Sequence, residues 1–281
     1  MLKEFEKFVI NRGIDLAAWG SQRGEYPLTP TGKRNYKTFI NGLKKGIPMN
    51  LSEHIGILDG YDYTSGVTGL ENLEGLNLNK GCLILANHER ELPLKGRSII
   101  FPIGFHVRQK GGKEIRWVYG TDLSLDQFGK GGYEKSLNFI LVGGKNLFGR
   151  KKTQIKGMRE LLQAIKKDFV GLYPEGDNSD KLLKGKSEAG RIIAQAASQK
   201  VDIICSTTRL NGRTFEVTFQ KLENERVLEL YEQTNDTIES AAQAKSVAGQ
   251  NVVDYAMNTI ALPLPPEKRG HYQNPEQALG V

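Results

Sequence analysis

The residues best suited to proton transfer follow an apolar run in LILANHERELP, residues 83–93. Asn87 and His88 come directly after the apolar residues, and Glu91 lies three positions beyond the histidine. A histidine titrates near neutral pH, so it can take a proton from an attacking hydroxyl when a carboxylate holds its other ring nitrogen. We therefore predict that His88 is a general base and that Glu91 orients it. A histidine that only forms hydrogen bonds in a turn is the alternative on these residues alone.

A second polar segment, GLYPEGDNS at residues 171–179, also follows an apolar run. Loops of this kind offer backbone N–H groups and polar side chains to a ligand. Glu175 stands directly after the apolar run, which favours a binding site, although an ordinary turn uses the same residue types. We take Glu175, Gly176, Asn178 and Ser179 as candidate ligand-binding residues.

A basic cluster in GGKNLFGRKK, residues 143–152, is the third candidate. Arg150 can bind a phosphate through two parallel hydrogen bonds, although a basic triplet is more often a solvated surface. The GKS sequence that begins at Gly185 is not a nucleotide-binding loop, because that motif needs a glycine where Asp180 stands. No metal site is expected, since two cysteines and four histidines show no ligand-like spacing.

Secondary structure must place these residues at the ends of strands. β-type runs predict strands at residues 82–86, 115–120, 169–174, 201–207 and 215–219. Three helices are predicted between and after them: one with Ile155, Met158, Leu161, Leu162 and Ile165 on one face, an alanine-rich one over 187–199, and a final one over about 248–260. Alternating strands and helices predict a layered α/β domain whose active groups lie where strands end.

Three segments divide the chain in this interpretation. Residues 1–70 form an accessory segment with a helical face near residues 2–9, which prolines and glycines interrupt from Pro27 onward. Residues 71–270 form the α/β domain. Residues 271–281 are a polar tail that we expect to fray.

The composition limits the classes of protein that fit. With 281 residues, 38% of them hydrophobic and 25% charged, the chain is long enough for one large folded domain. No run approaches the roughly 20 apolar residues that span a bilayer. Cys82 and Cys205 lie inside apolar runs, which predicts buried free thiols and a reducing cytoplasm. The net charge of +7 favours an anionic partner.

In their order along the chain, these motifs resemble those of the glycerol-3-phosphate and lysophosphatidic acid acyltransferase family over about residues 67–272. The family's first motif is NH, four further residues and then aspartate, a position that Pro93 holds here. ELPL at residues 91–94 resembles the family's DIPL, so Glu91 would replace the aspartate. The second motif is matched loosely by Gly144, Phe148 and Arg150.

Two further segments carry the resemblance. YPEGDNS, residues 173–179, resembles the family's third motif without its Thr-Arg pair, and Gly190 resembles a glycine of the next helix. Val201, Ile203 and Ile204 represent the fourth motif, and IALPLPPEKRGHY at residues 260–272 resembles the family's terminal helix and its final P-x-x-R-G-x-Y.

The resemblance implies a mixed central sheet flanked by helices, with a helical N-terminal extension. It also implies transfer of a fatty acyl group from acyl-CoA or acyl carrier protein to a hydroxyl of a lysophospholipid or glycerol-phosphate-type acceptor, with no bound cofactor. His88 would be the base and Glu91 its partner. The residues implied to position the acceptor are Asn87, Arg150, Glu175, Gly176, Asn178 and Ser179.

A lipid acceptor implies a cytoplasmic protein attached peripherally to the inner face of the membrane, through lysines that bind anionic headgroups. We expect these to be Lys151, Lys152, Lys166 and Lys167. Pro93 and the missing Thr-Arg pair leave open a lipid- or acyl-binding pseudoenzyme of the same fold. A basic nucleic-acid-binding protein is a further alternative, although no nucleic-acid-binding motif accompanies the charge.

Overall fold

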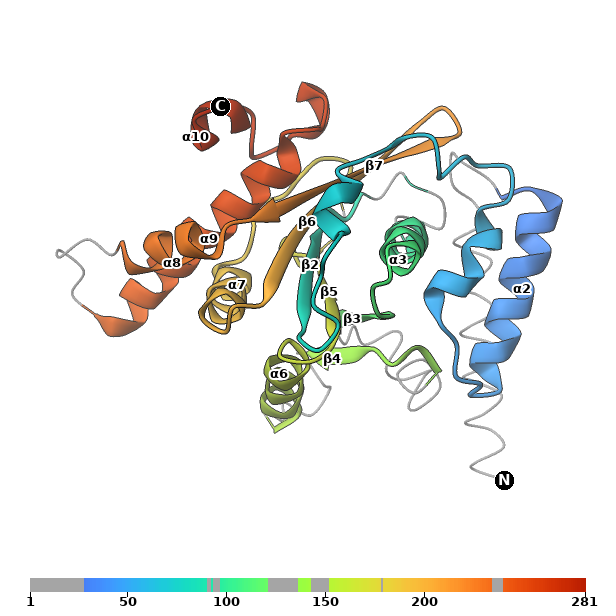
Figure 1. The fold of residues 1–281 in the computed structure, drawn as a ribbon, viewed down its shortest axis with the longest axis horizontal. Helices are drawn as coiled ribbons and strands as arrows, with labels where there is room; N and C mark the ends of the chain where they lie inside the picture. Colours follow the sequence, from blue (N-terminus) through green and yellow to red (C-terminus); the bar gives the residue numbers. More distant parts are fainter. Residues whose placement is uncertain are drawn as a thin grey trace.

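The chain folds around a mixed seven-stranded sheet with helices on both faces, as seen in a computed structural model that describes residues 28–89, 92, 97–120, 136–142, 152–177, 179–233 and 240–281 (Figure 1). The strand order is β1-β7-β6-β2-β5-β3-β4. β6 and β7 pair antiparallel, and the other neighbours pair parallel. The predicted α/β class, with a mixed sheet flanked by helices, is confirmed.

The strands follow the predicted β-type runs, with β1 and β4 in addition. Their bounds are β1 Val67–Thr68, β2 Cys82–Ala86, β3 Ile115–Gly120, β4 Ile140–Val142, β5 Phe169–Leu172, β6 Asp202–Asn211 and β7 Thr214–Leu222. The helices are α2 Pro30–Lys44, α3 Ile100–Gln109, α6 Lys152–Ala164, α7 Ser187–Ser198, α8 Asn224–Glu232, α9 Ala241–Ala261 and α10 Pro275–Leu279. Short 3₁₀ turns are η1 Leu51–Leu58, η2 Leu70–Leu73, η3 Arg97–Ile99 and η4 Pro266–Lys268.

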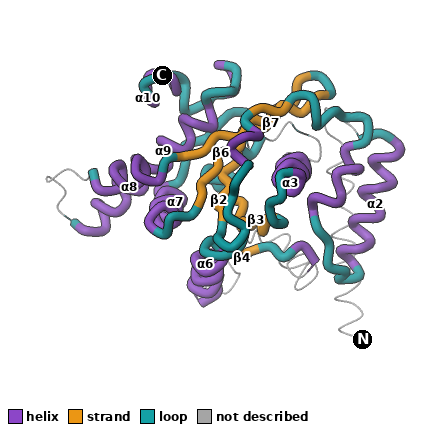
Figure 2. Tube along the Cα trace, viewed as in Figure 1, coloured by secondary structure: helices purple, strands orange, loops and turns teal. Residues whose placement is uncertain are grey.

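The central strand β2 is buried on both faces because helices cover both. Its side chains alternate, so Leu83 and Leu85 join the core under α6, α7 and α9, while Cys82, Ile84 and Ala86 join the core under α2, η1 and α3. Figure 2 shows these two helical layers on opposite sides of the sheet. An uninterrupted apolar run is the expected sequence of such a strand.

Pro30 begins helix α2, an element that was not predicted from the sequence. Pro30 is in the first turn of α2, where a missing N–H costs nothing, and the Thr29 side chain accepts the Gly32 N–H at 3.0 Å. The apolar face includes Phe39 and Leu43, which are buried against η1 and α3. The helix expected near residues 2–9 lies outside the described residues.

Helices α7 and α9 cross in close contact at two glycines. A Cβ on Gly190 would lie 1.7 Å from the Gly249 carbonyl oxygen, and one on Gly249 would lie 2.3 Å from the Ser187 oxygen. Only glycine permits this approach. Leu161 of α6 and Ile165, which directly follows the helix, are buried as expected, but Met158 of α6 is exposed.

The C-terminal segment is packed, so the expectation that it frays is wrong. Tyr272 is buried, and its hydroxyl donates to Asp254 Oδ1 at 2.8 Å and accepts the Gly185 N–H at 2.9 Å. Arg269 forms an ion pair of 2.8 Å with Glu276 of α10. Polar residues here are ordered by specific partners, both within the segment and, for Tyr272, far away in the sequence.

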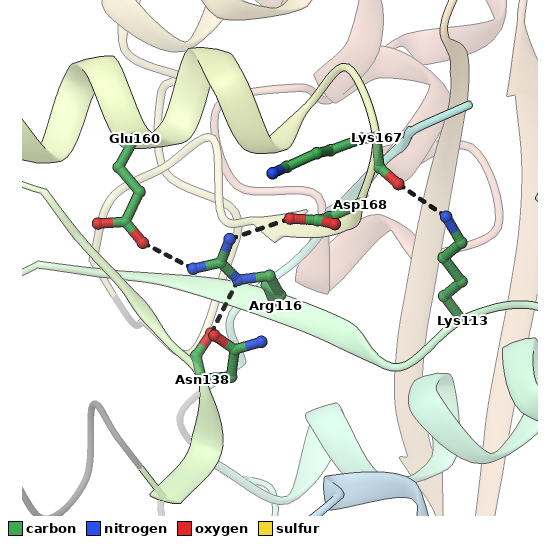
Figure 3. Close-up of polar contacts among 6 residues, drawn as sticks. All are labelled: Lys113, Arg116, Asn138, Glu160, Lys167 and Asp168. Atoms are coloured by element: carbon green, nitrogen blue, oxygen red, sulfur yellow. Dashed lines mark hydrogen bonds and ion pairs between the residues drawn. The ribbon is translucent and has the colours of Figure 1, made fainter. Parts of the chain in front are cut away.

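An ion-pair cluster secures the amino end of β3 (Figure 3). Arg116 contacts Asp168 at 3.0 Å and Glu160 of α6 at 2.6 Å, and it donates to the Asn138 carbonyl oxygen at 3.2 Å. These contacts join β3 to α6 and to the residue before β5. The opposite end of the parallel strands carries the candidate site.

Candidate functional site

The two polar segments meet because they follow neighbouring parallel strands. Leu85 of β2 is level with Leu172 of β5, so the residues after both strands emerge at the same edge of the sheet. The Ser179 N–H donates to the His88 carbonyl oxygen at 3.2 Å. The sequence-predicted candidates His88, Glu175 and Ser179 are therefore brought together.

Asn87 fastens the end of β2 to β6. It is 2% exposed, its Nδ2 donates to the Thr208 carbonyl oxygen at 2.8 Å, and its Oδ1 accepts the Thr208 N–H at 2.8 Å. The side chain thus continues the backbone pairing of the sheet by one step. These two hydrogen bonds fix the position of Asn87, directly before His88. The predicted contact of Asn87 with a substrate stays a prediction.

The His88 ring lies at the end of an aromatic stack. It stacks on Tyr173 with 4.4 Å between ring centroids and an interplanar angle of 18°, and Tyr173 stacks on Trp117 at 5.1 Å and 19°. Burial raises the pKa of the Tyr173 hydroxyl above its ordinary value. Sequence reasoning missed the stack, because Trp117 comes from β3 and its contact depends on the strand order.

Glu175 holds the main chain on both sides of the site. Its Oε2 accepts the His88 N–H at 3.0 Å and its Oε1 accepts the Leu183 N–H at 2.7 Å. The pKa of Glu175 is raised to about 7, mainly because the side chain is only 2% exposed. The two N–H groups oppose this rise, and the charges of Asp177 and Glu89 add to it. A carboxyl perturbed in this way is typical of functional sites.

The C-terminal segment closes the site from the other side. Lys268 Nζ forms an ion pair with Glu89 Oε1 at 2.8 Å and donates to the Asp180 carbonyl oxygen at 3.4 Å. Asn87, His88, Glu175 and Leu264 join these residues around a cavity of about 10 Å³, which is roughly the space for one water molecule. The cavity fits a hydroxyl-sized group beside His88.

Of the remaining predicted site residues, the structure describes Gly176. Gly176 adopts a φ of +70°, the left-handed conformation that favours glycine, and a Cβ there would lie 2.5 Å from Lys186 Nζ. Glu91, Arg150 and Asn178 lie outside the described residues, so their predicted roles stay predictions.

Cys82 and Cys205 are free and buried, as predicted, and burial raises the pKa of both thiols. Within the described ranges, no group of three His, Cys, Asp or Glu side chains is arranged to hold a metal ion. No helix in that part of the chain has both the length and the apolar character needed to cross a bilayer.

Fold and site together define an α/β protein with a histidine at the carboxyl edge of its parallel strands. No protein-family model and no curated protein sequence matches the chain. The solved structures similar to it include the 1-acyl-sn-glycerophosphate (LPA) acyltransferase PlsC from Thermotoga maritima, with 13% identity and a TM-score of 0.39 over 89% of this chain and 96% of that one. A likeness at this level does not bear on function.

Proposed function

We propose that the chain is an O-acyltransferase that moves a fatty acyl group from an acyl thioester to a hydroxyl of a lysophospholipid or glycerol-phosphate-type acceptor. The observation that carries the proposal is the junction of the two motif segments, where Glu175 Oε2 accepts the His88 N–H at 3.0 Å. The NH and PEG motifs resemble those of one acyltransferase family, and here they meet at one cavity. The terminal EKRG segment joins the same cavity through Lys268.

In the proposed reaction His88 takes the proton of the acceptor hydroxyl as its oxygen attacks the thioester carbonyl carbon. The tetrahedral intermediate then collapses, the carbon–sulfur bond breaks, and the leaving thiolate takes the proton from the imidazolium. No acyl-enzyme forms. A positioned base of this kind contributes roughly 10²- to 10⁴-fold.

The proposed roles of Glu91, Arg150 and Asn178 rest on the resemblance of their motifs, and those of Glu89 and Glu175 rest on their contacts. Glu91 orients the His88 ring, and Arg150 with Asn178 positions the acceptor's polar head. Glu89 forms an ion pair with Lys268 at 2.8 Å. Glu175 acts on the main chain of His88, so it is a positioning residue in addition to its expected place beside the acceptor.

A thioester-release assay with acyl-CoA or acyl carrier protein and a panel of lysophospholipids tests the proposal. His88→Ala should lower turnover by about 10²- to 10⁴-fold. The matched control is His271→Gln, which changes an exposed histidine and should retain the wild-type rate. Equal rates of thiol release for wild type and His88→Ala would rule out the proposed acyltransferase activity.

A pseudoenzyme of the same fold is the second candidate, favoured by Pro93 at the position of the family's aspartate and by the small cavity beside His88. It predicts that the chain binds acyl-CoA or lysophospholipid with no release of thiol. Calorimetric titration next to the thioester assay separates the two functions.

A further inference from the structure

The aromatic stack of Trp117, Tyr173 and His88 ends on one face of the proposed base. Tyr173 directly follows β5 and stacks on the His88 ring with 4.4 Å between the centroids and 18° between the planes. Trp117 of β3 stacks on Tyr173 in turn, at 5.1 Å and 19°. The reaction steps described above assign no role to this contact, although it is the closest ring neighbour of His88 among the described residues.

The sheet itself builds the stack. Trp117 lies level with Gly171 of β5, two residues before Tyr173, and a Cβ on Gly171 would lie 2.4 Å from Trp117 Cε3. The indole ring therefore lies directly against the glycine, in space that a larger residue would occupy. Trp117 is buried, whereas His88 is partly exposed. The stack thus connects a rigid, buried pair of strands to the histidine at the edge of the sheet.

The contact between the Tyr173 and His88 rings has two physical consequences. The face of a tyrosine ring carries partial negative charge, so it attracts a cation that lies within about 6 Å of the ring centroid. An imidazolium at the observed 4.4 Å meets this condition. The nearly parallel planes also oppose rotation of the imidazole about its Cβ–Cγ bond, because rotation would turn its edge into the Tyr173 ring. Tyr173 therefore favours both the charged form and one orientation of His88.

Charged side chains also surround His88, and they come from three segments. The cavity beside the histidine is lined by charged residues of its own segment, of the loop after β5 and of η4, namely Glu89, Glu175, Asp180, Lys181 and Lys268. Asp177 of the same loop acts on Glu175. A substitution of Tyr173 leaves the number and sign of these charges unchanged. The effect of the stack on His88 can therefore be measured separately from theirs.

We propose that Tyr173, supported by Trp117, is a positioning residue for the base, because its ring stabilises the imidazolium form of His88 and holds the imidazole plane. The inference rests on the proposed function, in which His88 becomes an imidazolium when it takes the proton of the acceptor hydroxyl. A group that favours the imidazolium over the neutral ring stabilises the transition state more than the bound substrate, so it raises kcat. The stack acts in addition to the proposed contact of Glu91 with the ring.

Titration of the histidine ring signals by NMR tests the stack without any need for turnover. The chain has four histidines, and the spectrum of His88→Ala identifies the signal of His88. Tyr173→Leu keeps an apolar side chain beside the imidazole but removes the ring, so the midpoint of the His88 titration should move to lower pH by about 0.4–0.7 pH units. The matched control is Tyr231→Leu, which removes a partly buried ring from α8 on the opposite face of the sheet and should leave the midpoint unchanged.

A second series of variants preserves the shape of the side chain, so it tests the stack even where loss of the ring disturbs the fold. Tyr173→Phe keeps the face of the ring, whereas a ring-fluorinated phenylalanine at the same position keeps the ring but withdraws electrons from its face. The His88 midpoint should match that of wild type with phenylalanine and move to lower pH with the fluorinated ring. The same midpoint with both residues, or a move to higher pH, would overturn the proposal.

The thioester-release assay adds a measurement on the base during turnover. Tyr173→Leu should lower kcat about two- to fivefold and leave the acceptor KM unchanged, and the acidic limb of its pH–rate profile should move to lower pH together with the NMR titration. A raised KM with an unchanged kcat would contradict positioning. Failure of the proposed function gives a different pattern, because a wild type that releases no thiol but shows the expected titration shifts overturns only the enzyme. Normal turnover with unshifted titrations overturns only the role of the stack.

Discussion

Replacing Glu175 by glutamine should remove a pH dependence of stability that the buried carboxyl imposes. Burial raises the pKa of Glu175 from its ordinary value of 4.5 to about 7 in the folded chain. Between these values the folded state binds the proton and the unfolded state releases it. The free energy of unfolding therefore falls as the pH rises through this range, and the contribution of the protonated carboxyl is lost above the folded pKa of about 7.

The size of the effect follows from the two pKa values. Each unit of difference corresponds to about 1.4 kcal/mol, so the wild type loses roughly 2–3 kcal/mol between pH 5 and pH 8.5 because of this one group. Glutamine never ionises, but its amide nitrogen faces one of the two N–H donors, from His88 or Leu183. That mismatch costs about 1–3 kcal/mol at every pH.

Urea unfolding at a series of pH values separates the two contributions. Glu175→Gln should be less stable than wild type at pH 5, and the difference should change in favour of the variant by about 2–3 kcal/mol at pH 8.5. Glu188→Gln, at an exposed position of α7, is the control for loss of one charge and should follow the wild-type profile. Parallel profiles for wild type and Glu175→Gln would refute the role of burial.

Two other substitutions test how the site and its supporting helices are held. Asn87→Ala should lower the free energy of unfolding by about 2–4 kcal/mol in urea, because the N–H and C=O of Thr208 lose buried partners; a loss below about 1 kcal/mol would contradict this. Gly190→Ala should cost about 2 kcal/mol or more despite the helix propensity of alanine, because its Cβ would meet the Gly249 oxygen at 1.7 Å; an unchanged melting temperature would show that α7 and α9 separate easily.

The edge of the sheet that carries the site could be predicted because its signals are local. An apolar run that ends in Asn87 and His88, and another that ends before Glu175, predict two strand ends, and parallel pairing places such ends together. Helix α2 was not predicted from the sequence, because a proline disrupts the interior of a helix but is favoured in its first turn. Thr29 directly before Pro30 is the combination that favours a helix start, and the hydrogen bond from the Gly32 N–H to the Thr29 side chain shows that Thr29 caps the helix.

Contacts between distant residues account for the rest of what the sequence could not predict. His88 and Glu175 are 87 residues apart, and their spacing does not reveal that the carboxylate meets a main-chain N–H instead of a ring nitrogen. The order of the tail depends likewise on the Tyr272 hydroxyl finding Gly185 and Asp254. The polar composition of the C-terminal segment predicts fraying, because composition does not show that Tyr272 has hydrogen-bond partners in Gly185 and Asp254.

The loop that follows β5 bonds both polar main-chain groups of His88. The His88 N–H donates to Glu175, and the His88 carbonyl oxygen accepts the Ser179 N–H. A change in that loop can therefore displace the base without touching the acceptor. If the chain is an acyltransferase, a Glu175 substitution that lowers kcat and leaves the acceptor KM unchanged reports loss of the base's position, whereas loss of an acceptor contact raises KM. This distinction assigns Glu175 to positioning or to acceptor binding, which turnover alone cannot do.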